Sequence, residues 1–366
     1  MREKIFLLMN LLKEFLCERD NIMKSNRRAD FGIINFWWCD DHGAILTAFA
    51  LQSYLEEQGY SSELLKCWKY YDDEKRKNGI SWQFEKKYLK TSENIYRTYD
   101  DIYEIDNNKK LNDDYIGFIT GSDQVFRPDY VPDSWYLTFV NGKGKIAVSA
   151  SFGISEFICP DRKRFERIKK SLEEFDYISV REDSGVKICN NYFEVDAFHM
   201  LDPVFLINKE KYEKIIKESK KEKNNKYIFC YIRDLNSDIM SMIDNININN
   251  HYELVWCDEN MPVEDFLFNT LNCDYMITDS YHGMCFSIIF NKNFLCIRNE
   301  LRGKARFISL QKQLGLNEES FLDEVKKIDS IIEIDYTYIN QRLKMLSEKC
   351  SKWLKMILNE VYQKYR

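Results

Sequence analysis

The chain has 366 residues, which is too long for one ordinary core and predicts about two domains. Its 53 lysine and arginine residues and 59 aspartate and glutamate residues give a formal net charge of −6. This charge excludes a globally basic nucleic-acid-binding protein but not a local basic site for an anion. The 45% hydrophobic content and the low count of 13 glycines and 5 prolines are typical of a folded globular protein without long disordered stretches.

Residues 1–26 are predicted to form a helical extension, because their apolar residues recur at the spacing of one helix face. Polar residues interrupt the apolar run and no small-residue cleavage site follows, so we do not expect a secretory signal. No stretch offers the roughly 18 consecutive apolar residues of a transmembrane helix. The extension is expected to dock on protein, with binding at a membrane surface as the alternative.

Eleven cysteines are scattered over the chain, and no two have the C-x-x-C spacing of a zinc or redox site. Most lie among apolar residues, where a free thiol behaves as a small hydrophobic side chain. This usage predicts a reducing compartment, so we expect a cytoplasmic protein, with the inner face of the membrane as a further location.

The first half predicts alternating strands and helices. An apolar run at residues 31–38 predicts a buried strand, and the helical spacing after Gly43 predicts a helix that ends before Gly59. Residues 69–110 are dense in charged residues and tyrosine, with weak periodicity, and are expected to form helices and a loop. Further strands are expected at 62–68, 115–120, 145–150 and 177–180, with a helix at 160–175.

The charged run at residues 217–225 predicts a linker or a solvated helix end, and a second alternation follows it. Residues 338–365 predict a long amphipathic helix that packs back over both halves. The other elements expected in this half are strands at 227–232, 254–257, 275–278 and 294–297, and helices at 262–271 and 284–290.

Strands that alternate with helices indicate the α/β class, and we predict two Rossmann-like, doubly wound domains that face each other across a cleft. A helical extension is expected at each end of the chain. The predicted divisions are residues 1–26, 27–216, 217–336 and 337–366.

Polar turns directly after the predicted strands are the candidate site residues, because ligands of open α/β sheets bind beyond the carboxyl ends of the strands. Two of these turns, at Gly43 and Gly283, lead into helices whose first backbone N–H groups favour anions. For any single turn the alternative is an ordinary helix cap. The candidates are Asp41, His42, Gly43, Gly121, Ser122, Asp123, Gln124, Ser151, Gly153, Arg181, Ser280, Tyr281, His282 and Gly283.

Two of these candidates carry reactive groups. His282 is a candidate general acid or base, because an imidazole titrates near neutral pH; the alternative is a structural histidine. Arg181 is placed to bind a carboxylate or a phosphate with two parallel hydrogen bonds. Its alternative is a surface ion pair with Glu182 or Asp183.

Several enzyme signatures are missing from the sequence: the P-loop, the G-x-G-x-x-G loop after the first strand, H-E-x-x-H and G-x-S-x-G. Asp40, Asp41 and Asp123 carry carboxylates that suit a divalent cation, but their spacing is nonspecific. We therefore expect no metal and no bound cofactor.

Taken together, the turns resemble the polysaccharide pyruvyl transferase family over about residues 31–315. The segments GSDQVF and DSYHG, with their flanking residues, are specific as a set. The resemblance runs through HGAILTAFALQSYLEEQGY (42–60), FITGSDQVF (118–126), SASFGIS (149–155), YISVREDSG (177–185), LDPVFL (201–206) and YMITDSYHGMCFSIIFNKNF (275–294).

The resemblance implies a fold similar to the GT-B glycosyltransferases, with phosphoenolpyruvate as a co-substrate. The implied reaction transfers the pyruvyl group to two hydroxyls of a sugar in a cell-surface polysaccharide (exopolysaccharide) precursor, forming a ketal and releasing phosphate. It also implies that His282 is the acid/base and that Arg181 binds the donor. The implied partners are phosphoenolpyruvate and a nucleotide- or lipid-linked sugar acceptor.

The chain departs from the family pattern at two places. The first turn commonly reads Asn-Tyr-Gly but here has Asp41 and His42, and an added carboxylate is unfavourable beside a trianionic donor unless it faces the sugar or His42 offsets it. Some members carry an arginine two residues before the histidine, where this chain has Ser280. The arginines considered as its replacement are Arg233, Arg298 and Arg302.

Two alternatives stay open at this point. One is a GT-B glycosyltransferase that uses a nucleotide sugar. The other is a non-catalytic member of a polysaccharide assembly complex, associated with a glycosyltransferase or with the membrane surface.

Overall fold

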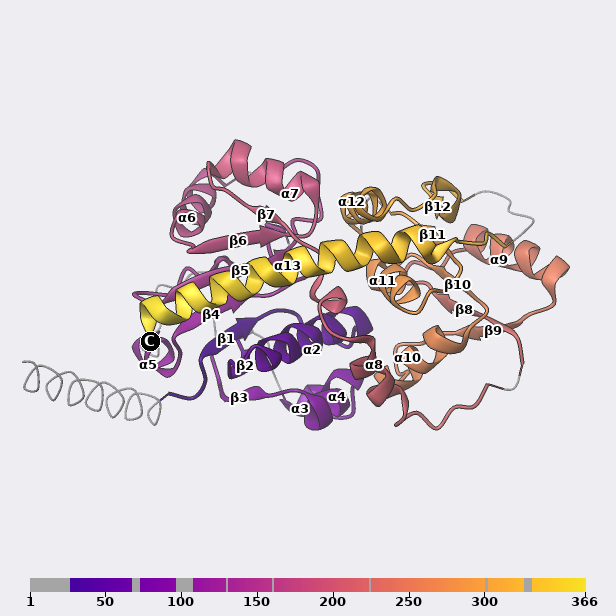
Figure 1. Cartoon of the computed structure of the whole chain (residues 1–366), viewed down its shortest axis with the longest axis horizontal. Helices are drawn as coiled ribbons and strands as arrows, with labels where there is room; N and C mark the ends of the chain where they lie inside the picture. Colours follow the sequence, from indigo (N-terminus) through magenta and orange to yellow (C-terminus); the bar gives the residue numbers. More distant parts are fainter. Residues whose placement is uncertain are drawn as a thin grey trace, which may run out of the picture.

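The computed structural model describes residues 27–67, 73–96, 108–129, 131–159, 161–223, 225–299, 302–325 and 331–366. These residues form two parallel sheets with helices packed around them (Figure 1), which confirms the predicted α/β class with two Rossmann-like domains. The predicted helix at residues 1–26 lies outside the described residues. The predicted division between residues 216 and 217 stays a prediction.

The first sheet has seven strands in the order β3-β2-β1-β4-β5-β6-β7, and its neighbouring strands are parallel. The chain changes direction across the sheet between β1 and β4, which is the switch point of a doubly wound sheet. The central strands are buried apolar runs, as parallel sheets require. Their bounds are β1 Phe31–Ile34, β2 Ser62–Lys66, β3 Thr91–Ile95, β4 Gly117–Thr120, β5 Gly144–Ala150, β6 Tyr177–Val180 and β7 Phe198–His199.

The second sheet has five parallel strands in the order β12-β11-β10-β8-β9, with its switch point between β8 and β10. At each switch point, one of the two strands (β1 in the first sheet, β10 in the second) leads into a helix through a turn that carries candidate residues. The strand bounds are β8 Tyr227–Tyr231, β9 Glu253–Trp256, β10 Tyr275–Thr278, β11 Phe294–Ile297 and β12 Phe321–Leu322.

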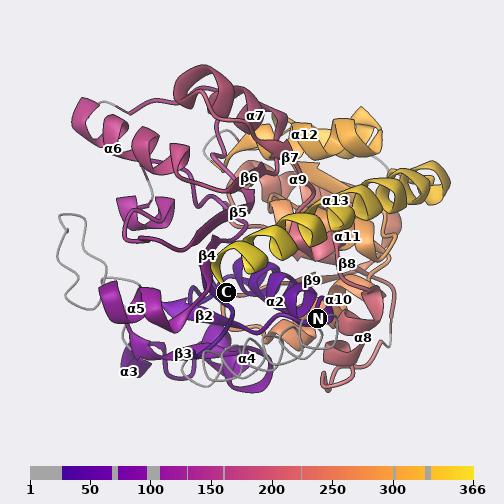
Figure 2. The same ribbon diagram turned by 60° about the vertical axis from the view of Figure 1, so that its left-hand side comes forward.

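Helices connect the strands and cover the sheets (Figures 1 and 2). Those of the first part of the chain are α2 His42–Glu57, α3 Asp73–Arg76, α4 Ile80–Tyr88, α5 Asn108–Asp114, α6 Arg162–Glu173, α7 Asp183–Ile188 and α8 Lys209–Ile216. Those of the second part are α9 Ser237–Asn250, α10 Val263–Asn272, α11 Tyr281–Ile289, α12 Lys304–Leu314 and α13 Tyr336–Tyr365.

Two sequence predictions need correction. The first strand ends at Ile34 and not at residue 38, because the chain turns where the Trp37 N–H donates to Asn35 Oδ1 at 3.1 Å. The stretch 69–110 contains the strand β3 besides helices; its sequence, T-S-E-N-I, is polar because it forms the edge of the sheet.

Helix α13 runs across both sheets (Figure 1), as the amphipathic pattern predicted. At its start, the Tyr336 hydroxyl donates to the carbonyl of Lys292 at 2.5 Å, in the second domain. Towards its end, the helix packs on β4 and β5 of the first sheet, where Leu358 and Val361 are buried. The helix therefore ties the two domains together.

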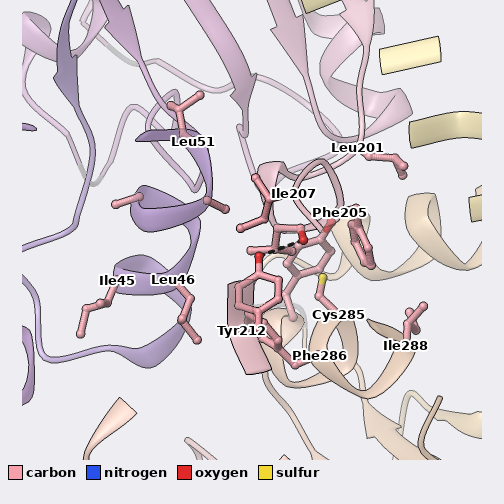
Figure 3. Packing of buried hydrophobic residues seen from close by; sticks show 14 of the residues in the cluster. Ile45, Leu46, Leu51, Leu201, Phe205, Ile207, Tyr212, Cys285, Phe286 and Ile288 are labelled. Carbon is pink, nitrogen blue, oxygen red and sulfur yellow. Dashed lines mark hydrogen bonds between the residues drawn. The ribbon is translucent and has the colours of Figure 1, made fainter. Parts of the chain in front are cut away.

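Buried hydrophobic side chains of both domains form one continuous cluster (Figure 3). Ile45 and Leu46 of α2 reach it from the first domain, and Phe286 of α11 from the second. Tyr212 of α8 lies between them: its ring meets Phe286 edge-on at 5.1 Å, and its hydroxyl donates to the Val204 carbonyl at 2.9 Å. An apolar interface of this kind holds two domains in a fixed relation.

No helix among the described residues is both long enough and apolar enough to cross a membrane. The cysteines in this part of the chain are free thiols, and most of them are buried.

Candidate active site

The carboxyl ends of the two sheets meet where α2 follows β1 and α11 follows β10. Gly43, in the first turn of α2, lies directly against His282 in the first turn of α11. A Cβ placed on Gly43 would lie 2.0 Å from His282 Nδ1, so only glycine permits this approach. Candidate residues that are far apart in the sequence and follow strands of different sheets are thereby brought together.

Asp202, which precedes the short 3-10 helix Pro203–Phe205, is the polar centre of this junction and is fully buried. Its Oδ1 accepts a hydrogen bond from the Thr47 hydroxyl of α2 at 2.9 Å. Its Oδ2 accepts from the Ser122 hydroxyl at 2.9 Å and from Arg181 Nη1 at 2.7 Å. One carboxylate thus joins α2 to the turns that follow β4 and β6.

His282 lies beside this carboxylate, with its Nε2 3.5 Å from Asp202 Oδ2 and only 6% of its side chain exposed. Burial raises the pKa of Asp202, but His282 and Arg181 lower it well below the ordinary aspartate range, so this carboxylate is ionised. His282 Nε2 is buried and has no hydrogen-bond partner among the described residues. An imidazole in this position can give a proton to a ligand and take one back.

Arg181 is a buried ion-pair residue, and the alternative of a surface pair with Glu182 or Asp183 is wrong. Its side chain is fully buried, with Nη1 on Asp202 and Nη2 2.8 Å from Asp123 Oδ1. Although burial lowers the pKa of Arg181, these two carboxylates raise it above its ordinary value. Donor binding by Arg181 stays a prediction; in the structure it neutralises two carboxylates.

Asp123 has a backbone conformation that is rare for a residue with a side chain, with φ at 92°. Its carbonyl accepts the Ser151 N–H at 2.9 Å, which joins the turns after β4 and β5. Burial raises the pKa of Asp123, but Arg181, His282 and Arg306 lower it below its ordinary value. Strained backbone of this kind costs about 1–3 kcal/mol and clusters at functional sites.

The predicted turn at Ser151 and Gly153 is held by Glu182, a fully buried residue. Glu182 Oε1 accepts the Ser151 hydroxyl at 3.0 Å and the N–H groups of Phe152 and Gly153 at 2.7 and 3.0 Å. Burial raises the pKa of this carboxyl group. Gln124 packs against Gly153, where a Cβ would lie 2.2 Å from its Oε1.

The first turn is arranged differently from expectation. Asp41 forms an ion pair with Arg233 from the second domain, at 3.2 Å, so Arg233 offsets its charge. His42 is turned away: its Nε2 lies 2.8 Å from the Met261 carbonyl, and its ring stacks on Phe266 at 4.6 Å. Burial lowers the pKa of His42, which fits a neutral packing role between the domains.

The helix N-termini at Gly43 and Gly283 are capped by side chains. The N–H of Ala44 donates to Asp41 Oδ1 at 3.0 Å, and the N–H of Gly283 donates to Ser280 Oγ at 3.4 Å. The N–H groups of Ala44 and Gly283, which were expected to be unpaired, therefore already have partners. Gly121, also a candidate, donates its N–H to the Ile34 carbonyl at 2.8 Å.

The arginines proposed to replace the one missing at Ser280 have partners elsewhere. Arg298 pairs with Asp323 at 2.7 Å, and Arg302 Nε donates to Asp234 at 2.7 Å.

Sequence reasoning missed Asp202 as a site residue, and it also missed Arg306, in α12. Its guanidinium carbon lies 5.2 Å from the centre of the Tyr281 ring, and that of Arg181 lies 4.6 Å from it. Arg306 was not found because it lies inside a helix and does not follow a strand.

Within the described ranges, no group of three or more histidine, cysteine, aspartate or glutamate side chains is arranged to hold a metal ion. Two α/β domains, each built on a doubly wound parallel sheet, are the class that this fold defines. Among solved structures, UDP-N-acetylglucosamine 2-epimerase from Rickettsia bellii is similar with 10% identity and a TM-score of 0.51, covering 91% of this chain and 96% of that one. At this identity the likeness shows the fold alone.

A glycosyltransferase from Rickettsia africae ESF-5 is also similar, with 9% identity and a TM-score of 0.47, covering 92% of this chain and 94% of that one. A search of curated proteins finds no significant match. The family model described as polysaccharide pyruvyl transferase matches residues 41–300, which is more than half of the chain. The chain belongs to this family, and it is therefore a transferase of polysaccharide biosynthesis.

Proposed function

We propose that the protein transfers the pyruvyl group of phosphoenolpyruvate to two hydroxyls of a sugar in a cell-surface polysaccharide precursor. The products are a pyruvate ketal and phosphate. The observation that carries the proposal is the placement of His282 beside the ionised carboxylate of Asp202, at the junction of the two sheets, in a chain of this family.

His282 supplies the proton chemistry in this proposal. His282, whose Nε2 lies 3.5 Å from Asp202 Oδ2, gives a proton to the methylene carbon of phosphoenolpyruvate, which leaves a cationic C2. A sugar hydroxyl attacks C2 and gives its proton to the imidazole. The bond from C2 to the phosphate oxygen then breaks, and a second hydroxyl closes the ketal. The first hydroxyl proton replaces the one that His282 gave to the methylene carbon, and the second hydroxyl proton ends on the released phosphate.

The test is phosphate release from phosphoenolpyruvate in the presence of nucleotide- and lipid-linked sugars, with mass spectrometry to detect the ketal. His282→Gln is expected to lower turnover by about 10²–10⁴-fold, the usual contribution of general acid–base catalysis. His251→Gln is the matched control, because His251 is exposed at the end of α9 and should leave turnover unchanged.

Two outcomes would overturn the proposal. One is the absence of both turnover and thermal stabilisation by phosphoenolpyruvate. The other is full activity of His282→Gln, which would remove the proposed acid/base. Stabilisation by a nucleotide sugar alone would favour the glycosyltransferase alternative. Stable co-purification with a glycosyltransferase, without donor binding, would favour a non-catalytic role.

A further inference from the structure

We propose that Arg306 is a donor-binding residue that holds the phosphate or the carboxylate of the donor. The inference rests on the proposed function, since it names a further residue of the same site. Arg306 lies in α12, and none of the candidate turns found in the sequence belongs to this helix.

The start of α12 is packed directly on the first domain. Gly303, which precedes the helix, has φ at 81°, and a Cβ placed on it would lie 2.8 Å from the carbonyl oxygen of Gly153. Two glycines therefore allow backbone to touch backbone across the domain junction. This contact carries Arg306 to the candidate turns after β4 and β5.

The charge of Arg306 is poorly matched by the protein. Of the carboxylates in the described residues, Asp123 is the one within ion-pair distance, with Oδ1 3.4 Å from Arg306 Nη1. The same oxygen is already held more closely by Arg181, at 2.8 Å. The other donors of Arg306 reach neutral carbonyls of Arg302 and Gly303.

Burial makes this mismatch costly. The Arg306 side chain is only 7% exposed, and burial together with the neighbouring Arg181 lowers its pKa to about 10. Arg298 is the contrasting case in the same domain, because its buried guanidinium has Asp323 and Glu318 as separate partners. A buried guanidinium that lacks a carboxylate of its own is stabilised when a ligand brings one, or brings a phosphate.

The position of Arg306 fits the proposed chemistry. Its guanidinium lies near the ring of Tyr281, which directly precedes His282 in α11. Arg306 and His282 both lie close enough to Asp123 to lower the pKa of its carboxyl group. An anion bound by Arg306 would therefore lie at the junction where His282 is placed to move a proton.

The experiment measures donor binding to the full chain by calorimetry with phosphoenolpyruvate. Arg306→Gln is expected to raise the Kd by about 10- to 100-fold, the effect of losing a charged hydrogen-bond donor. Arg306→Lys keeps the charge without the planar fork and should bind with intermediate affinity. Arg298→Gln is the matched control: it removes a buried arginine and should keep the wild-type Kd.

A second arm uses thermal shifts with inorganic phosphate and with pyruvate at constant ionic strength. The fragment that stabilises the wild type but not Arg306→Gln identifies the group that Arg306 holds. If Arg306→Gln does not fold, weaker phosphoenolpyruvate binding by Arg306→Lys supports the proposal, and wild-type binding by that variant overturns it.

The outcomes separate the two proposals. Wild-type affinity in Arg306→Gln would overturn the role of Arg306 and leave the proposed function standing. A shift with inorganic phosphate that depends on Arg306, without any phosphoenolpyruvate binding, would support the anion site and overturn the proposed function. A wild type that binds none of the three anions would overturn both.

Discussion

Asp202 shows how one residue organises the candidate site. It has no exposed surface, yet it stays ionised because Arg181, His282 and hydroxyl donors surround it. Such a carboxylate is expensive to bury and expensive to lose, since its removal leaves Arg181 with one partner fewer. The contribution of Asp202 to the free energy of unfolding can be measured separately from its effect on turnover, because this contribution depends on pH.

Asp202→Asn is expected to lower the free energy of unfolding at pH 7 by about 3–5 kcal/mol, the usual cost of breaking a buried ion pair. The pKa of Asp202 in the folded state lies below its unfolded value of about 3.9, so its stabilisation is complete well above that pH and is lost as the pH falls through it. The difference between wild type and variant should therefore shrink by about 1.4 kcal/mol for each pH unit below about 3.9.

Urea unfolding followed between pH 3 and pH 7 checks this expectation. The control is Asp244→Asn, an exposed position on α9, where a surface substitution should change stability by less than about 0.5 kcal/mol. A difference between wild type and Asp202→Asn that stays constant with pH would contradict the assignment.

The sequence identified His282, Asp123 and Arg181 because each lies within a few residues of the end of a strand, and the carboxyl ends of parallel strands collect such residues at one edge of the sheet. It did not identify the partners of Arg181. Asp202 follows the two-residue strand β7, which is too short to give a pattern, and Asp123 becomes a partner only when β4 and β6 lie on either side of β5. Arg306 depends on a contact between domains, which local patterns do not encode.

At the scale of elements, the contact between α2 and α11 sets the geometry of the site. Gly43→Ala would place a methyl group against the His282 ring, at a position where the ring cannot move without leaving Asp202. We expect a loss of about 1–3 kcal/mol in stability from overpacking, together with a fall in turnover.

Gly59→Ala, at the other end of α2, is the matched control. A Cβ there meets nothing within 4 Å, but φ is +85°, so the substitution strains the backbone away from the site. It should lower the melting temperature without changing turnover per folded molecule. Equal turnover in both variants would show that the approach of Gly43 to His282 is unimportant for the reaction.

Buried central strands were predicted well, since burial on both faces leaves a hydrophobic run such as that of β8. The strands that escaped prediction lie at sheet edges: β3 is polar, and β7 and β12 have two residues each. Helix α9 also escaped, because asparagine-rich sequence has weak helix propensity and tertiary packing of Ile239 and Ile243 holds it.

At the scale of the whole molecule, the hydrophobic cluster shared by both domains predicts one cooperative unfolding transition. Phe286→Ala removes a ring that contacts Tyr212 and Phe266, and it should lower the free energy of unfolding by about 3–5 kcal/mol. Hydrogen exchange measured by mass spectrometry should show both sheets losing protection together.

Ile248→Ala is the control for this experiment, because that side chain is 63% exposed. Two separate transitions, with only the second sheet weakened by Phe286→Ala, would contradict a shared core.

Helix α13 has a mechanical consequence. Its 30 residues span about 45 Å, and both ends are fastened: Arg342 donates to the Gln313 carbonyl at 2.7 Å in one domain, and Lys364 binds Asp176 at 2.7 Å in the other. A helix bound to both domains resists hinge rotation. Moving the domains apart would break the contacts of α13 with one domain or bend the helix. Donor and acceptor are therefore expected to enter by side-chain rearrangement at the junction, with the domains staying in place.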